Sequence, residues 1–336
     1  MDAWVRWGAD DHLARWSHTV GMALFRSRRV GSLVVGAAIV TTLAFGAGPL
    51  FGVGALFVVI VPFERLFPRH RQRVRRPQLG TDVAYALLAG PLGAIGLAVA
   101  ITIGLGSLFW VPGLLFRPVV TSLPPSARLV VAFVLFDLLV YWAHRYSHEV
   151  PFLWRFHAIH HSTVHLDWVS GFRTHPFDGV LLAPAFAFVA AAGFSPKVSG
   201  ALLAVQVITG LFLHANVKWR LRVLQKLVVT PEFHHWHHAN EIDAHNSNYA
   251  AFLPLWDVWF GSYFVPADRR PVVYGVSDTI PMGLVAQLRY PFRGLANPFR
   301  LARHPRAACR RFGANVRRGV GQVLRVTFGP RFRTMK

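Results

Sequence analysis

Residues 129–161 read LVVAFVLFDLLVYWAHRYSHEVPFLWRFHAIHH. In this stretch an apolar run leads directly into a set of histidines. His144 and His148 are four residues apart, so on a helix they lie on one face. His157, His160 and His161 stand at i, i+3 and i+4 and again share a face. Neutral imidazole is the commonest protein ligand for iron, copper and zinc. The stretch therefore predicts a helical metal site at the end of a membrane helix.

A second stretch, HHWHHANEIDAH at residues 234–245, repeats the same spacing. Its first, fourth and fifth residues again stand at i, i+3 and i+4. Histidines that merely lie on the surface or at the membrane interface, without a ligand, would not explain why so many histidines occur in two short stretches. Eight imidazoles are too many for one ion and suit two metal ions that share a site. The eight expected ligands are His144, His148, His157, His160, His161, His234, His237 and His238.

The composition indicates an integral membrane protein. The chain has 336 residues, 53% of them hydrophobic, and only 15 acids, and its mean hydropathy is +0.38. Apolar runs cover residues 30–63, 83–116, 129–143, 179–196 and 198–217, and a bilayer core needs roughly 20 residues to cross. We expect an all-α membrane protein with about four to six transmembrane helices and a cytosolic helical cap that carries the dimetal site. The first run starts too late and is too long for a cleaved signal peptide.

The order of the apolar runs predicts the topology. The fourth and fifth runs can form a hairpin that turns near Pro196 and returns the second histidine stretch to the side of the first. The arginines of the loop 69–76 and of residues 289–336 place that side in the cytoplasm by the positive-inside rule. We expect a bacterial inner membrane protein whose metal site faces the cytoplasm. Residues 30–63 cross once, or turn at Gly48-Pro49 as a hairpin.

Three regions follow from these patterns. Residues 1–125 form an N-terminal membrane region with a basic loop, residues 126–268 the catalytic domain, and residues 269–336 a basic cytosolic tail. The net charge of +21 comes from residues that flank membrane runs, so attraction to anionic lipid explains it better than nucleic acid. The single cysteine, Cys309, excludes disulfide frameworks and cysteine-ligated iron–sulfur clusters.

The ordered motifs resemble one family. They are Asp137-x-x-x-Tyr141-Trp142-x-His144, the two His-x-x-His-His units, Thr230-Pro231 before the second unit, and the segment from Asn248-Tyr249 to Tyr263. Together they are similar to the fatty acid hydroxylase/sterol desaturase superfamily over residues 129–268. The resemblance implies two iron ions, O2 as co-substrate, and hydroxylation or desaturation of a lipid such as a sterol or fatty acyl chain. Zinc would be a purification artefact.

The resemblance extends to several further residues. His214, followed closely by Asn216, matches a ninth family ligand; the alternative is a helix-end histidine bonded to a backbone carbonyl. His175 lies in the pattern Arg-x-His-Pro and is expected beside the ligands rather than among them. His235 stands where arginine is common in the family. Other residues expected around the ligands are Asp137, His165, Asp243, Asn248 and Asp257.

The chemistry supports an oxygenase. Acids, bases and thiols at pH 7 cannot break an unactivated C–H bond, whereas iron with O2 can. Metal-bound imidazoles need acceptors on their second nitrogen, and the candidate carboxylates are Asp137, Asp167, Asp178, Glu232, Asp243 and Asp257. Without a dinucleotide-binding glycine motif, the chain requires an external donor, a ferredoxin or b-type cytochrome with its reductase.

Two other functions stay open. A membrane zinc hydrolase is disfavoured because His148-Glu149 lacks the second histidine of His-Glu-x-x-His. A metal-binding protein without oxygenase activity, or one that holds haem between two histidines, is the other alternative. The lipid substrate, the position oxidised, the choice between hydroxylation and desaturation, the electron donor and the oligomeric state cannot be read from the sequence.

Overall fold

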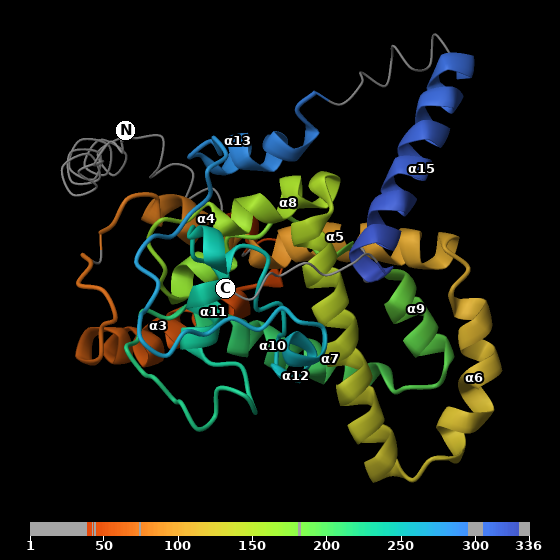
Figure 1. The fold of residues 1–336 in the computed structure, drawn as a ribbon, viewed down its shortest axis with the longest axis horizontal. Coiled ribbons are helices and arrows are strands. Elements are labelled where there is room, and N and C mark those ends of the chain that lie inside the picture. Colours follow the sequence, from red (N-terminus) through yellow and green to blue (C-terminus); the bar gives the residue numbers. More distant parts are fainter. Residues whose placement is uncertain are drawn as a thin grey trace, which may run out of the picture.

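The computed structural model describes residues 39–294, except 42, 44, 74, 181 and 182, and residues 305–328, with side chains of the last helix from 317 onward. The described chain is helical and contains no strand, only two isolated antiparallel bridges, Pro68–Val217 and Ala239–Tyr274. Figure 1 shows the arrangement. The elements are α3 (Gly48–Leu66), α4 (Leu79–Leu87), α5 (Ala89–Gly106), α6 (Trp110–Ser122), α7 (Pro125–Glu149), α8 (Pro151–His161), η1 (Trp168–Phe172), α9 (Ala183–Ala191), α10 (Pro196–His214), α11 (Pro231–His237), η3 (Ile242–Ala244), α12 (Leu255–Trp259), α13 (Leu284–Arg289), η4 (Tyr290–Phe292) and α15 (Pro305–Phe328).

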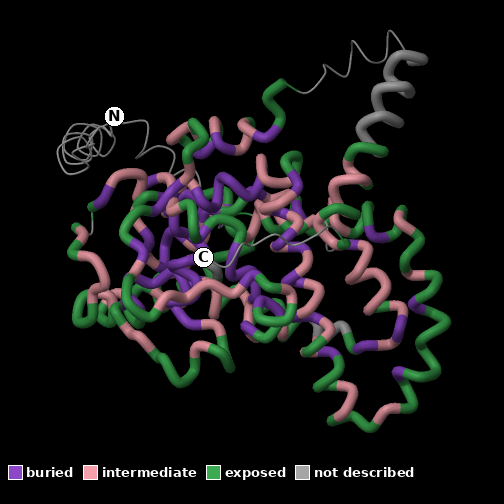
Figure 2. Tube along the Cα trace, in the orientation of Figure 1, coloured by how far each residue is buried: buried purple, intermediate pink, exposed green. Residues whose placement is uncertain are grey.

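The molecule has a compact body and a more open arm. The body gathers α4, α8, α10, α11 and α12, and the arm consists of α6, α9 and the N-terminal half of α7 (Figure 1). Buried residues concentrate in the body, whereas the arm is mostly intermediate or exposed (Figure 2). Leu115 and Val119 on α6 and Val130 on α7 are more than 60% exposed. Large exposed apolar surfaces of this kind are covered by lipid or a partner.

α7 joins the two parts. Pro125 begins the helix at a position that tolerates proline, and its 25 residues extend for about 37 Å. The first half exposes apolar side chains, whereas Val140, Tyr141 and Ala143 in the second half are buried. One helix therefore carries the chain from an apolar arm to the centre of the body, where His144 and His148 lie.

Two described helices, α5 and α7, are long and apolar enough to cross a bilayer, and residues 200–214 form a shorter apolar helix. The expected count of four to six is not confirmed within the described residues, where several apolar runs are interrupted. Run 83–116 breaks at Ser107–Phe109, where Leu108 adopts a φ of 59°. Among the described residues, run 179–196 contains the nine residues of α9, which extend for about 14 Å, less than a core of about 30 Å.

The N-terminal run also contains a break. Gly46, with a φ of 71°, separates α3 from the helical residues before it, two residues earlier than the expected turn at Gly48-Pro49. The break does not decide between one crossing and a hairpin. The start of this run, residues 30–38, lies outside the described residues, as does the tail beyond residue 328.

Candidate metal centre

The first group of histidines comes from three helices. α7 contributes His144 and His148, α8 contributes His157 and His161, and α11 contributes His237, and one ring nitrogen of each lies within 4.8 Å of the others. Pro151 begins α8 directly after the C-cap residue Val150 of α7, so the two helices meet at an angle with their histidines facing inward. Two consecutive helices therefore supply four of the five imidazoles.

The second group contains four histidines with the same property: His160, His214, His234 and His238. α10 ends at His214, so this side chain is presented at the helix terminus. α11 begins at Pro231 after the N-cap residue Thr230, whose hydroxyl accepts the N–H of Phe233 at 3.3 Å. The cap fixes the first turn of α11 and thereby the positions of its histidines.

Each His-x-x-His-His unit contributes to both groups. His157 and His161 belong to the first group and His160 to the second, while His237 belongs to the first and His234 and His238 to the second. All nine histidines expected as ligands, His214 included, thus lie in two adjoining groups. The unit is the element that couples the two groups, because neighbouring residues of one helix turn point to either side.

Five of the nine imidazoles hold an acceptor at Nδ1. The partners are the backbone oxygens of Tyr249 (2.7 Å from His144), Arg173 (3.1 Å from His160), Gly210 (2.7 Å from His214) and Ser247 (2.8 Å from His237), and the carboxylate of Asp178 (2.8 Å from His157). Because these oxygens can only accept, Nδ1 carries the proton and Nε2 presents a lone pair to the group. For His214 the two alternatives from the sequence hold together. Its Nδ1 bonds to a backbone carbonyl near the helix end, and its side chain also belongs to the second group.

The nitrogens that face one another fit a metal ion. The Nε2 atoms of His160 and His214 are 3.1 Å apart, and those of His144 and His157 are also 3.1 Å apart. Two unprotonated nitrogens cannot hydrogen-bond to each other, whereas two nitrogens bound at about 2.1 Å and at right angles to one ion lie about 3.0 Å apart. The buried Nε2 atoms of His148 and His237 have no hydrogen-bond partner among the described residues.

The electrostatics of the cluster favour neutral ligands. Burial, reinforced by neighbouring histidines, lowers the pKa well below the ordinary 6.5 in His160, His161, His234, His237 and His238. Burial alone would raise the pKa of Asp178, but the adjacent His157 imidazole holds it below its ordinary value. At neutral pH these five histidines are uncharged and Asp178 is ionised, as a cation-binding site requires.

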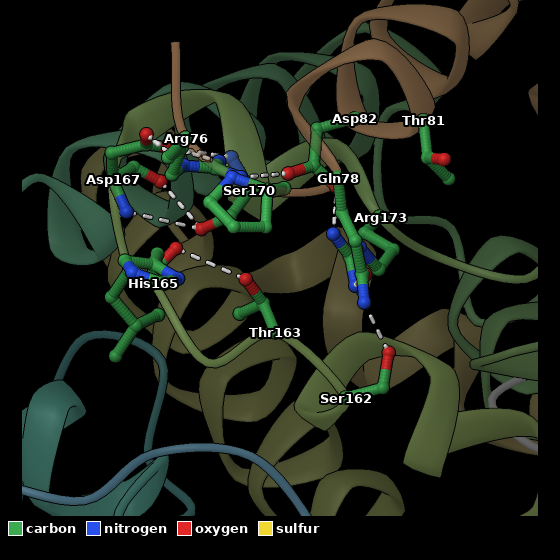
Figure 3. A network of polar contacts seen from close by, with 12 residues as sticks. Arg76, Gln78, Thr81, Asp82, Ser162, Thr163, His165, Asp167, Ser170 and Arg173 are labelled. Atoms are coloured by element: carbon green, nitrogen blue, oxygen red, sulfur yellow. Dashed lines mark hydrogen bonds and ion pairs between the residues drawn. The ribbon is translucent and has the colours of Figure 1, made fainter. Parts of the chain in front are cut away.

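A buried ionic network supports the second group. Arg173 forms ion pairs with Asp82 at 2.5 Å and donates hydrogen bonds to Gln78 and Ser162. Arg76 lies between Asp82 (2.7 Å) and Asp167 (2.5 Å), and Figure 3 shows these side chains converging from α4, η1 and the end of α8. The network fixes the backbone at residue 173, whose carbonyl accepts from His160.

Three residues expected around the ligands hold the backbone rather than an imidazole. Asp257 accepts the N–H groups of Tyr249 and Ala250, both at 2.8 Å, and burial raises the pKa of Asp257 to about 6. Asn248, at a φ of 61°, bonds to the backbone of Phe264. Asp137 accepts three donors from residues 252–256. Together they hold the segment whose Tyr249 carbonyl meets His144.

Four further expected residues do not join the histidine groups. His165 lies in the loop beside Arg76 (Figure 3), and His175 bonds to Leu288. His235 bonds to the Tyr274 hydroxyl and the Ala215 carbonyl. The Asp243 side chain is 69% exposed and pairs with Arg269. The expectation that these residues surround the ligands thus receives no support from their positions.

A cavity of about 230 Å³ opens onto the first group, where His148, His161 and His237 form part of its wall. Trp154 also lines this cavity, with its ring centroid 5.2 Å from that of His148, and its indole N–H donates to Asp278 at 2.9 Å. No motif in the sequence marks Trp154, and Asp178 is one of six carboxylates that the sequence offers as acceptors for the imidazoles. Of these six, Asp178 is the one with a hydrogen bond to a histidine of the two groups.

Comparison with known proteins agrees with this site. A family model described as fatty acid hydroxylase matches residues 129–262. The ornithine lipid hydroxylase OlsE of Rhizobium tropici is 31% identical over 257 residues, which cover 70% of this chain and 72% of that protein. Alkylglycerol monooxygenase of Homo sapiens is 29% identical over 44% of this chain and 33% of its own length.

Sphingolipid C4-hydroxylase of Schizosaccharomyces pombe is 25% identical over 44% of this chain and 51% of its own length. No solved structure matches the chain. The extent of the match to the ornithine lipid hydroxylase, the family model and the paired histidine units agree with one another. The chain belongs to the fatty acid hydroxylase/sterol desaturase superfamily.

Proposed function

We propose that this protein is a membrane-bound oxidoreductase that hydroxylates or desaturates a lipid at a pair of iron ions. The convergence of nine imidazoles into groups of five and four carries the proposal. The named functions of its relatives, which are hydroxylation and monooxygenation of lipids, support the reaction class. In this assignment His144, His148, His157, His161 and His237 hold one ion, and His160, His214, His234 and His238 hold the other.

The bound iron pair supplies the redox chemistry that activates O2 for attack on a C–H bond. Hydroxylation consumes the lipid, O2, two electrons and two protons and yields the alcohol and water, so a reductant is required. The chain's own residues position the ligands: Asp178 and four carbonyls keep the Nδ1 protons away from the ions. Seven of the nine histidines are buried, which limits contact between the site and bulk water.

The surroundings suggest how the reactants arrive. α5 and α7, with the neighbouring apolar helices, hold the protein in a bacterial inner membrane, and the body with the histidines faces the cytoplasm. Electrons come from an external ferredoxin or b-type cytochrome with its reductase, at the polar face where the cavity beside Trp154 opens. An acidic carrier would be steered to the arginine-rich surface.

Comparison of lipid extracts tests the function. A strain that lacks the gene is complemented with the wild type, with His148→Ala, or with the control Asp268→Asn, at an exposed residue outside both groups and both cavities. We expect the wild type and Asp268→Asn to restore a lipid that has gained one oxygen atom or lost two hydrogen atoms. His148→Ala should not restore it. Identical lipid profiles in all strains would refute the proposal.

Metal analysis separates the alternatives. Iron near two per chain together with O2-dependent oxidation supports the oxygenase. Zinc with hydrolysis that does not need O2 would indicate a hydrolase, and bound metal without either activity a metal-binding protein. Because zinc can enter during purification, the metal count is read with activity.

A further inference from the structure

A cavity of about 410 Å³ lies between α3, the loop 68–73, α4 and η1. Apolar side chains form one part of its wall, among them Val61 from α3, Leu79 from α4 and Trp168 from η1. Phe57 also lines it and is 50% exposed, next to Val58 at 70% and Val59 at 58%. The cavity therefore adjoins an apolar surface that suits lipid chains.

The polar part of the wall has charges of both signs. At the rim stand Arg65, Arg71 and Arg73, all exposed, and none forms an ion pair with another described residue. Deeper in the cavity, one oxygen of Glu64 accepts the backbone N–H groups of Trp168 (3.0 Å) and Asn216 (2.9 Å). Guanidinium groups recognise phosphate and carboxylate strongly, so the rim suits an anion.

Glu64 lacks a cationic partner within the described residues. The nearby guanidinium of Arg76 is engaged by Asp82 and Asp167. Partial burial and the Asp167 carboxylate raise the pKa of Glu64 to about 7, which is the behaviour of a carboxylate without a counter-ion. A cationic group placed beside Glu64 would remove this deficit, so the interior suits an ammonium group.

The segment η1 separates the cavity from the metal centre. η1 forms its wall on one side and packs against His214 on the other, where a Cβ added to Gly171 would lie 3.1 Å from Nδ1 of His214. Asn216, two residues after His214, also lines the cavity and ties the loop in place through two hydrogen bonds with the backbone of His70. A ligand here is close to the second histidine group.

We propose that this cavity binds the headgroup of a zwitterionic lipid, its ammonium group beside Glu64 and its phosphate or carboxylate at Arg71 and Arg73. The lipid so held is the substrate, an assignment that rests on the proposed function. The apolar wall then receives the first part of its chains. A lipid with only the anionic group satisfies the rim and leaves Glu64 without a partner.

Binding to the purified, metal-loaded protein tests the site. The probes are phosphatidylethanolamine and phosphatidylglycerol with identical short chains, titrated by calorimetry below their micelle concentrations. Glu64→Gln keeps an oxygen for the two backbone amides but removes the charge. We expect it to weaken phosphatidylethanolamine binding about ten- to a hundredfold, the range for a charged hydrogen bond, and to change phosphatidylglycerol binding by less than about twofold.

Further variants keep the test decisive. The exposed double variant Arg71→Gln/Arg73→Gln should weaken both lipids, whereas Arg75→Gln, also exposed but outside the cavity wall, should weaken neither. If Glu64→Gln does not fold, as metal content and melting temperature will show, the double variant carries the test. An unchanged preference in Glu64→Gln, or unchanged binding in the double variant, overturns the proposal.

Lipid extracts distinguish the substrate from a resident membrane lipid. We expect the oxidised lipid to be zwitterionic and its yield to fall in Glu64→Gln cells whose protein retains its metal. If binding changes as expected but the yield does not, the cavity holds a resident lipid and the substrate assignment is wrong. If wild-type cells contain no oxidised lipid although the binding preference holds, the proposed function fails and the substrate assignment with it.

Discussion

Replacement of Asp178 tests whether a carboxylate orients the ligands of the first group. Its Oδ2 accepts the Nδ1–H of His157 at 2.8 Å, and the pKa of Asp178 lies below its ordinary value, so the group is ionised. Removal of such an outer partner weakens metal binding about 10- to 100-fold, or about 1.4–2.7 kcal/mol. Asp178→Asn retains an acceptor without the charge and should lie near the lower figure, and Asp178→Ala near the upper.

The measurement is a titration of the metal-free protein with Co²⁺ against a chromophoric chelator, which resolves the two binding steps. We expect one step to weaken and the other to stay within about twofold, because Asp178 contacts the first group alone. Asp243→Asn, at a carboxylate that is 69% exposed and pairs with Arg269 rather than with a histidine, is the matched control. If both Asp178 variants bind as tightly as the wild type in both steps, the carboxylate does not orient His157 and this reasoning is refuted.

Three more predictions follow from the fold and the site. His148→Ala and His234→Ala should each lower the bound metal by about one ion per chain, in different binding steps; loss of the same step in both would contradict two groups. Gly96→Ala should destabilise by about 1–3 kcal/mol, since the new Cβ would lie 2.3 Å from the carbonyl oxygen of Pro176, whereas Gly93→Ala, with nothing within 4 Å, should leave the melting temperature unchanged or raise it. The purified enzyme given lipid, O2 and NADPH alone should not turn over, and added ferredoxin with its reductase should start a reaction that slows as salt rises; sustained turnover without the carrier would show that no partner is needed.

The histidine spacing predicted which side chains meet but left their division between two ions open. The division follows from helix geometry, in which successive residues turn by roughly 100°. Relative to His157, His160 lies about 60° to one side and His161 about 40° to the other. One unit can therefore present ligands to two neighbouring ions. Which residue joins which group depends on how α7, α8 and α11 pack, and that packing is not encoded in the spacing alone.

The apolar runs predicted helices, yet the run 83–116 divides among α4, α5 and α6, and the expected number of membrane spans is not confirmed within the described residues. Hydropathy does not register a change of backbone direction within an apolar run. Leu108 adopts a left-handed φ of 59°. Leucine rarely adopts this conformation, so the residue type does not predict the break. A Cβ at Gly113 of α6 would lie 2.5 Å from the carbonyl oxygen of Phe188, and one at Gly104 of α5 would lie 2.9 Å from that of Ala183, so these two glycines allow close packing against α9.

The groups around the ligands were the least predictable part, and the reason is chemical. Four of the five Nδ1 acceptors are backbone carbonyls, which every residue type possesses, so no side-chain pattern marks them. The carboxylates other than Asp178 contact the residues that carry these carbonyls rather than the imidazoles themselves. Asp257 fixes the backbone of Tyr249, whose carbonyl meets His144, and the pairing of Asp82 with Arg173 fixes the carbonyl that meets His160. The carboxylates away from the ligands therefore act on the imidazoles through the main chain, and their replacement should disturb the metal groups while leaving every ligand in the sequence.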